Sequence, residues 1–477
     1  MNDLLKFITC GSVDNGKSTL IGHILYDSKL LYADQEQALI LDSKVGSRGG
    51  AIDYSLLLDG LMAEREQGIT IDVAYRYFTT DKRSFIVADT PGHEEYTRNM
   101  AVGASFAELA VILVDASQGV LVQTRRHARI CALMGIRHFV FAVNKMDLIG
   151  YNKSKFYAIL ADINSLSKEL NLQHTVSIPV SATEGDNITK HSPLMAWYKG
   201  ETLLEHLENV NIFASEAEKG FYMPVQRVCR PNHTFRGFQG QIESGDVAVG
   251  DKIAALPSGE TAIVKTIFTI DKQHDRAEIG HAVTIQLDRE VDVSRGCILE
   301  KDSALTCAKE FSSTLLWMDD VSLTAGSDYW IKIGTKLIPA VISGIKHKVD
   351  VNTGRFIPAD TISKNEIFLC NIILSEPIVL DRFSAHKTMG ELILIDRVSH
   401  ATSACGVVED VNIATEEDKR NYPDNFDITA DNLFLHIRNG RATGFGSRED
   451  RYPLFDFEDK KFSLICLWNK EEAEYEI

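Results

Sequence analysis

Apolar residues in the first part of the chain come in short runs that end in polar, acidic or glycine-containing turns. These runs cover residues 7–9, 84–88, 110–114, 138–143 and 175–179. Each has the length of a buried strand, and helix-length stretches lie between them. Such an alternation is typical of a parallel sheet covered by helices on both faces. We therefore expect residues 1–212 to form an α/β domain.

The pattern changes after about residue 223, where long helical periodicity ends. Strand-length runs such as 262–267 and 281–287 are separated by Gly, Asp, Pro and Ser turns, which indicates a β-barrel over 213–305. A second strand-rich stretch covers 306–411, and 393–398 and 406–411 are expected to be its closing strands. We therefore predict an α/β domain followed by two β-barrel domains.

The last segment, residues 412–477, is a C-terminal extension whose fold the sequence does not assign. It opens with a polar, charged stretch and then contains apolar runs at 433–437 and 462–468. We expect it to be folded.

Composition narrows the classes of protein. The 477 residues include 67 acidic and 50 basic side chains, a net charge of −17, and 44% of them are hydrophobic. The hydrophobic share supports packed cores, and the negative charge argues against a general nucleic-acid coat, which needs Lys and Arg to neutralise phosphates. We expect no nucleic-acid partner.

Location follows from what the sequence lacks. No apolar run approaches the roughly 18 to 20 residues of a membrane span, and the first residues do not resemble a secretory leader. The eight cysteines are scattered singly, without any Cys-x-x-Cys spacing, and indicate reduced thiols. We expect a cytoplasmic protein that does not bind a membrane.

A phosphate-binding motif follows the first predicted strand and precedes a helical run at 19–26. It matches Gly-x-x-x-x-Gly-Lys-[Ser/Thr], in which backbone N–H groups surround phosphate oxygens at a helix N-terminus. The lysine would reach the β and γ phosphates, and the last hydroxyl would bind Mg²⁺. The residues are Gly11, Ser12, Val13, Asp14, Asn15, Gly16, Lys17 and Ser18, followed by Thr19.

A second motif ends the predicted strand at 84–88. It consists of Asp89, Thr90, Pro91 and Gly92. An aspartate at a strand end can hold Mg²⁺ through a water molecule, and the Gly92 N–H can meet a γ-phosphate and lose that contact after hydrolysis. Asp-x-x-Gly alone is weak evidence, because it usually forms only a turn.

A third and a fourth motif indicate which base is bound. The third consists of Asn144, Lys145, Met146 and Asp147. The Asp147 carboxylate accepts two hydrogens from guanine, at N1 and the 2-amino group, whereas adenine would leave it unpaired. Backbone N–H groups at Ser181 and Ala182 can complete the pocket.

The four motifs follow one another in the order that a GTP-binding domain needs. Each stands at the carboxyl end of a predicted strand, where parallel sheets bind their ligands. Thr70, in the long insert between Lys17 and Asp89, is placed to give its hydroxyl to Mg²⁺ and to contact the γ-phosphate. The sequence predicts a GTP and Mg²⁺ site, with Ser18, Thr70 and Asp89 as metal ligands.

The insert at 63–71 and the Asp89 motif together resemble the switch regions of the translation-factor GTPases, the group that includes elongation factor Tu. In that family a histidine after Asp-x-x-Gly positions the attacking water, and His93 stands at this position. The family's apolar gate maps onto Val13 and Ile69. The resemblance implies an elongation factor Tu-like fold, with His93, Lys17 and Thr70 as catalytic residues.

Within that group, the stretches 5–18, 63–77, 89–105 and 115–148 look most like the GTPase subunits of bacterial sulfate adenylyltransferases. Turns in 236–296 resemble those of the translation factors, and the stretch 395–402 is similar to the closing part of the third domain of these GTPase subunits. The resemblance covers roughly residues 4–411, and the C-terminal extension, residues 412–477, has no counterpart in the family. The family's phosphate loop usually reads Asp-Asp where this chain has Asp14 and Asn15, which leaves the phosphate contacts intact.

The resemblance implies a heteromeric enzyme. A small catalytic partner subunit joins ATP and sulfate to form adenosine 5′-phosphosulfate and pyrophosphate, and GTP hydrolysis on the large subunit drives this unfavourable reaction. The chain would not contain the adenylyl-transfer site. No second phosphate-loop motif follows residue 18, so the adenylylsulfate kinase activity of some fused relatives is not expected.

Two other functions share the nucleotide motifs. A translation GTPase that delivers aminoacyl-tRNA has all of them, and so does a stand-alone regulatory GTPase. The charge of −17 counts against the tRNA carrier, as does the stretch 94–98, which resembles the sulfate enzyme.

Overall fold

The structure describes most residues of the first 412 and short stretches of the remainder. The computed structural model describes residues 4–27, 43, 54, 70, 72–212, 220–233, 235–270, 272–303, 305–350, 353–412, 434–438, 441–446 and 455–456. The chain divides into two units, Met1–Asn412 and Ile413–Ile477. The domain boundaries predicted within the first unit stay predictions. None of the described helices is long and apolar enough to cross a membrane.

A six-stranded sheet forms the first part of the chain, in the order β2-β3-β1-β4-β5-β6. Its parallel strands are β1 (Leu4–Cys10), β3 (Ser84–Asp89), β4 (Leu109–Asp115), β5 (His138–Asn144) and β6 (His174–Pro179). The sequence did not indicate one edge strand, β2 (Ala74–Thr79), which runs antiparallel to β3. Only residues 80–83 connect the two strands, too few for the crossover that a parallel pair needs.

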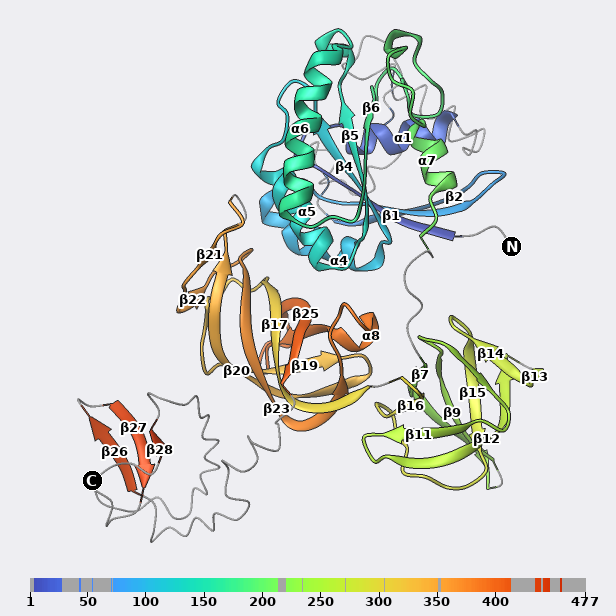
Figure 1. Cartoon of the computed structure of the whole chain (residues 1–477), viewed down its shortest axis with the longest axis vertical. Helices are drawn as coiled ribbons and strands as arrows, with labels where there is room; N and C mark the ends of the chain where they lie inside the picture. Colours follow the sequence, from blue (N-terminus) through green and yellow to red (C-terminus); the bar gives the residue numbers. More distant parts are fainter. Residues whose placement is uncertain are drawn as a thin grey trace. The chain divides into compact units, whose positions relative to one another are not determined.

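Helices cover both faces of this sheet (Figure 1). The hydrophobic cluster on one face includes α4 (Thr97–Phe106), α5 (Val122–Leu133) and α6 (Lys153–Glu169). The cluster on the other face includes α1 (Lys17–Asp27) and α7 (Leu203–Asn209). The predicted three-layer α/β domain is confirmed.

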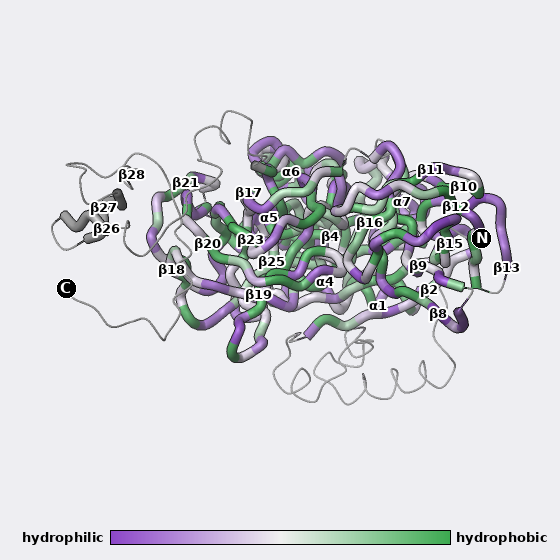
Figure 2. Tube along the Cα trace, turned by 90° about the horizontal axis from the view of Figure 1, so that it is seen from below, coloured by the Kyte–Doolittle hydropathy of each residue, from purple (hydrophilic) through white to green (hydrophobic). Residues whose placement is uncertain are grey.

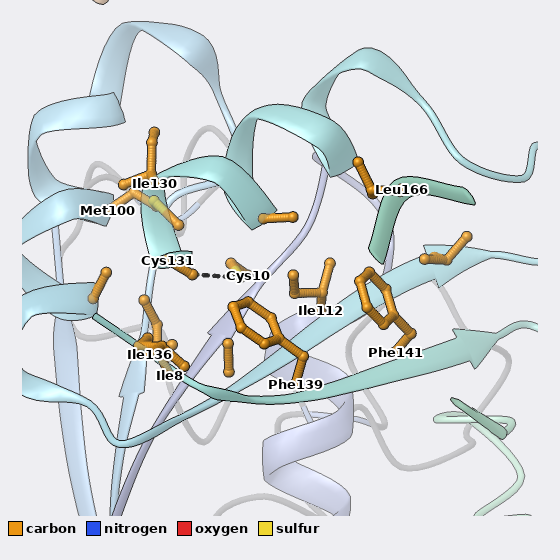
Figure 3. Packing of buried hydrophobic residues seen from close by; sticks show 14 of the residues in the cluster. Ile8, Cys10, Met100, Ile112, Ile130, Cys131, Ile136, Phe139, Phe141 and Leu166 are labelled. Atoms are coloured by element: carbon orange, nitrogen blue, oxygen red, sulfur yellow. Dashed lines mark hydrogen bonds between the residues drawn. The ribbon is translucent and has the colours of Figure 1, made fainter. Parts of the chain in front are cut away.

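Alternate residues of each central strand pack on opposite faces of the sheet. On β4, Ile112 packs beneath α5, whereas Val111 belongs to the cluster on the α1 side. Figure 3 shows the first cluster, with Phe139 and Phe141 from β5 beside Ile112. Burial on both faces is why these strands appear in the sequence as continuous apolar runs.

The next strands form the first barrel. They are β7 (Phe221–Pro224), β8 (Arg227–Asn232), β9 (Phe235–Gln241), β11 (Lys252–Leu256), β12 (Glu260–Thr269), β15 (Ala282–Leu287) and β16 (Ile298–Lys301), joined in the order β7-β16-β11-β12-β15-β9-β8. The short strand β13 (Lys272–His274) pairs with β12, and β10 (Asp246–Ala248) pairs with β14 (Arg276–Glu278). Hydrophobic and hydrophilic positions are interleaved along this part of the trace (Figure 2), as expected for strands with one buried face.

The second barrel is a closed ring of six strands, β19-β24-β25-β17-β23-β20, in which β20 pairs back to β19. They are β17 (Thr306–Trp317), β19 (Asp328–Ile333), β20 (Lys336–Val349), β23 (Ile367–Leu380), β24 (Glu391–Ile395) and β25 (Thr402–Asn412). The shorter β18 (Leu323–Thr324), β21 (Phe356–Ile357), β22 (Thr361–Ile362) and helix α8 (Lys387–Gly390) accompany the ring.

One predicted closing strand of this barrel, 393–398, is too long. The strand ends at Ile395, because the Asp396 carboxylate accepts hydrogen bonds from the backbone N–H groups of Val398 and Ser399 at 3.0 and 2.6 Å and forms a turn.

In the C-terminal unit, β26 (Phe434–Arg438), β27 (Arg441–Gly446) and β28 (Phe455–Asp456) form an antiparallel sheet. The apolar run predicted at 462–468 lies outside the described residues.

The two-faced core allows a stability test. Phe141→Ala removes a fully buried ring from β5 and should lower the free energy of unfolding by about 3 to 5 kcal/mol. Leu148→Ala is the control, because Leu148 is 69% exposed and its truncation should cost less than about 0.5 kcal/mol. Urea unfolding followed by circular dichroism measures both. Equal unfolding midpoints for the two variants would contradict this description of the core.

Candidate nucleotide-binding site

The phosphate loop connects β1 to α1, which begins at Lys17. Gly16 has φ +85°, and a Cβ there would lie 2.6 Å from the Asn144 Nδ2 atom. Asp14 is exposed and has φ +64°. Gly16 therefore satisfies both the backbone conformation and the close approach that the loop requires.

Lys17 is held inside this loop. Its Nζ donates to the backbone oxygens of Gly11 and Ser12, both at 3.0 Å. Burial lowers the pKa of Lys17, although Asp89 acts in the opposite direction. The Ser12 hydroxyl is buried and has no hydrogen-bond partner among the described residues. Among the described residues, the ammonium is bound by carbonyls and the hydroxyl lacks a partner, an arrangement in one loop that suits an anionic ligand.

The Asp89 carboxylate lies at the end of β3, next to the start of α1. It accepts from Ser18 Oγ at 2.9 Å and from Thr9 Oγ1 at 3.0 Å. Burial raises the pKa of Asp89, outweighing the opposing effects of Lys17, Ser18 and Thr9. Thr90 Oγ1 donates to Thr9 O at 2.7 Å and fixes the turn. A hydroxyl and a carboxylate that lie together supply the oxygen ligands that Mg²⁺ prefers.

The chain after Asp89 packs against the phosphate loop. A Cβ on Gly92 would lie 2.5 Å from Gly11 O and 2.7 Å from Lys17 Nζ, so only glycine fits. Pro91 is buried and His93 is exposed. The His93 Nδ1 atom accepts from Glu95 N at 3.2 Å, which orients the ring.

Thr70 is half-buried. Residues 55–69 and 71 lie outside the described residues, and with them the predicted gate residue Ile69. The roles of Thr70 as metal ligand and catalytic residue stay predictions.

The two base motifs meet at the ends of β5 and β6. The Asn144 side chain donates to Asn15 O at 2.7 Å and accepts from Ala182 N at 2.8 Å. Ser181 Oγ donates to Asp147 Oδ1 at 2.7 Å. The structure therefore brings the phosphate loop and both base motifs together through hydrogen bonds.

Residues between these anchors complete the site. Met146 is fully buried and fixes the turn before Asp147 through Met146 N, which donates to Val180 O at 3.2 Å. Thr19 is buried in α1, and Val13 is half-buried in the phosphate loop.

Sequence reasoning missed the partner of Lys145. The Lys145 Nζ atom lies 2.8 Å from Asp115 Oδ2, at the end of β4. Burial by itself raises the pKa of Asp115, but hydrogen bonds from Lys145 and Ser117 outweigh it and hold the pKa below its ordinary value. The available signal was an acidic residue directly after a buried strand, at the same sheet edge as the other motifs.

The fold and the site define a P-loop GTP-binding protein. Residues 2–213 match the family described as elongation factor Tu GTP binding domain, and residues 310–409 match the family described as GTP-eEF1A C-terminal domain-like. The chain belongs to the sulfate adenylyltransferase subunit 1 family, a branch of the translation-factor GTPases.

Its similarity to these relatives covers most of the chain. It is 50% identical to sulfate adenylyltransferase subunit 1 of Aliivibrio salmonicida over 413 residues, 86% of each protein. It is 47% identical to the same subunit of Saccharophagus degradans, over 88% of this chain and 90% of that protein. The bifunctional enzyme CysN/CysC of Xylella fastidiosa is 50% identical over 85% of this chain and 66% of its own length. A crystal structure of sup35 complexed with GDP matches 87% of the chain with 22% identity and a TM-score of 0.40.

The buried charge of Asp89 leads to a stability prediction. The raised pKa means that the unfolded chain ionises first as the pH rises, so the charged carboxylate destabilises the nucleotide-free protein at neutral pH. Asp89→Asn should therefore raise the unfolding temperature at pH 7 without nucleotide or Mg²⁺, and the gain should shrink towards pH 4. Asp81→Asn, in an exposed turn, is the matched control. A lower unfolding temperature for Asp89→Asn at pH 7 would contradict this explanation.

Proposed function

We propose that this chain is the GTP-hydrolysing subunit of a cytoplasmic two-subunit sulfate adenylyltransferase. A small partner subunit forms adenosine 5′-phosphosulfate and pyrophosphate from ATP and sulfate, and GTP hydrolysis drives that reaction. The observation that carries the proposal is the pair of hydrogen bonds made by the Asn144 side chain. They join the phosphate loop at Asn15 to residues 181–189, here called the base loop, at Ala182. The name "subunit 1" of the relatives supports a partner subunit.

The phosphate end of the site binds the charged part of GTP. Backbone N–H groups of residues 11–18, together with Lys17, contact the phosphates. Ser18, Thr70 and Asp89 would hold Mg²⁺, which would supply positive charge next to the phosphate oxygens. The short contact between Ser18 and Asp89 supports this ligand set.

His93 orients the attacking water. It follows Gly92, whose backbone lies against the phosphate loop, so its ring can reach the γ-phosphate side of the site. The side chain is exposed, so its ring is accessible to a bound nucleotide. We expect hydrolysis by the chain alone to be slow, because phosphoryl transfer needs charge stabilisation that a partner supplies when it completes the site.

Delivery of tRNA is the weaker candidate. The relatives that cover most of this chain carry the name of the sulfate enzyme, and the net charge of −17 disfavours a polyanionic partner. A stand-alone regulatory GTPase would not explain why these relatives are named as subunits of the sulfate enzyme.

Guanine selectivity is tested at Asp147. Asp147→Asn should shift preference from GTP towards xanthosine triphosphate, because the amide can donate to the 2-oxo group of xanthine. Dissociation constants for both nucleotides measure the shift, expected to be at least about tenfold in their ratio. Asp162→Asn, on the exposed face of α6, is the control and should leave the ratio unchanged. Unaltered selectivity in Asp147→Asn would refute the base site.

The water-positioning role is tested at His93. His93→Ala should leave GTP affinity nearly intact and slow single-turnover hydrolysis by on the order of a hundredfold or more, because it removes a group needed only during reaction. His191→Ala replaces a half-exposed histidine paired with Glu205 and serves as the control. A His93→Ala protein that hydrolyses GTP at the full rate would exclude His93.

The division of labour is tested by measuring two products. Phosphate release from GTP and pyrophosphate release from ATP are followed for this chain, for the small subunit and for their mixture. We expect weak GTP hydrolysis and no adenylylsulfate from this chain alone, and a joint rise of both activities in the mixture. Synthesis of adenylylsulfate by this chain alone would overturn the proposal.

A further inference from the structure

A buried histidine in the phosphate-loop helix faces the base loop. His23 lies on α1, six residues after Lys17, and only 5% of its surface is exposed. Its Nδ1 atom lies 3.0 Å from the backbone oxygen of Ala182. A carbonyl oxygen can only accept, so Nδ1 carries a proton and donates it to this bond.

The Ala182 residue is thereby held from both sides. Its N–H donates to Asn144 Oδ1 at 2.8 Å, and its oxygen accepts from His23. The loop also packs directly on the imidazole ring, because a Cβ on Gly185 would lie only 2.5 Å from His23 Nε2. The position of the base loop therefore depends on a side chain of α1, the helix that begins in the phosphate loop.

A second bond repeats this link one turn further along α1. Asp27 Oδ2 accepts from Thr189 Oγ1 at 2.6 Å. Residues 181–189 are thus tied to α1 at two points. Ser181, at the start of this segment, donates to the Asp147 carboxylate. The position of this segment therefore also affects the position of the carboxylate that selects guanine.

We propose that His23 is a positioning residue for guanine recognition. Its bond to Ala182 holds the base loop against Asn144, and Ser181 in turn holds Asp147 in place to accept from the base. The proposal rests on the base site proposed above. Loss of the bond loosens the base end of the site and leaves the phosphate contacts of Lys17 in place.

The test compares GTP with inosine triphosphate, which lacks only the 2-amino group. Both nucleotides make the same phosphate contacts. The dissociation constant of inosine triphosphate divided by that of GTP therefore reports on the base end alone. His23→Gln places its amide one bond too far and should lower this ratio about fivefold, the effect of losing one hydrogen bond. His23→Asn keeps a donor at the distance of Nδ1 from Cα and should restore the ratio.

Two further variants complete the test. His206→Gln is the matched control, since His206 lies on α7, pairs with Glu201 and should leave the ratio unchanged. Thr189→Val removes the second link without touching the core of α1 and should lower the same ratio. Unchanged ratios in both His23→Gln and Thr189→Val overturn the proposal, as does His23→Asn behaving like His23→Gln. Wild-type protein that fails to distinguish the two nucleotides would instead refute the base site itself.

Discussion

The amide side chain of Asn144 is the constraint on which the rest of the site depends. It ends β5 and joins the phosphate loop at Asn15 to the base loop at Ala182, with both bonds shorter than 3 Å. The approach is so close that Gly16 has no room for a side chain. Since Asn144 is nearly inaccessible to solvent, both loops must adopt this arrangement or leave its polar atoms unpaired.

Two buried ionisable groups, Lys17 and Asp89, lie at the phosphate end of the site. Burial lowers the pKa of Lys17 and raises that of Asp89, so each group is driven towards its neutral form. The ligand proposed above, a nucleotide with Mg²⁺, would supply the opposite charge for each of them. The site is therefore built for its ligand at some cost to the stability of the free protein, an arrangement typical of functional sites.

The sequence was sufficient to predict the elements and motifs that a local pattern of residues determines. The motifs around Lys17, Asp89, Asn144 and Ser181 stand at the ends of strands whose apolar runs were recognisable, because these strands are buried on both faces. The antiparallel strand β2 was missed because it lies at the sheet edge and alternates weakly. The pairing of Lys145 with Asp115 was missed although Asp115 directly follows a predicted strand at the same sheet edge. The contact of His23 with Ala182 could not be found, because the two residues are 159 positions apart and only the fold brings them close.

The most direct test of this account is amide hydrogen exchange of the full chain with and without GTP and Mg²⁺. We predict joint protection of four segments, 10–19, 89–93, 144–147 and 181–183, because in the proposed site GTP binds between loops that Asn144 already connects. Exchange in the strands of both barrels should change little. Binding of GTP that leaves the segments at 144–147 and 181–183 unprotected would contradict a single site at this edge of the sheet.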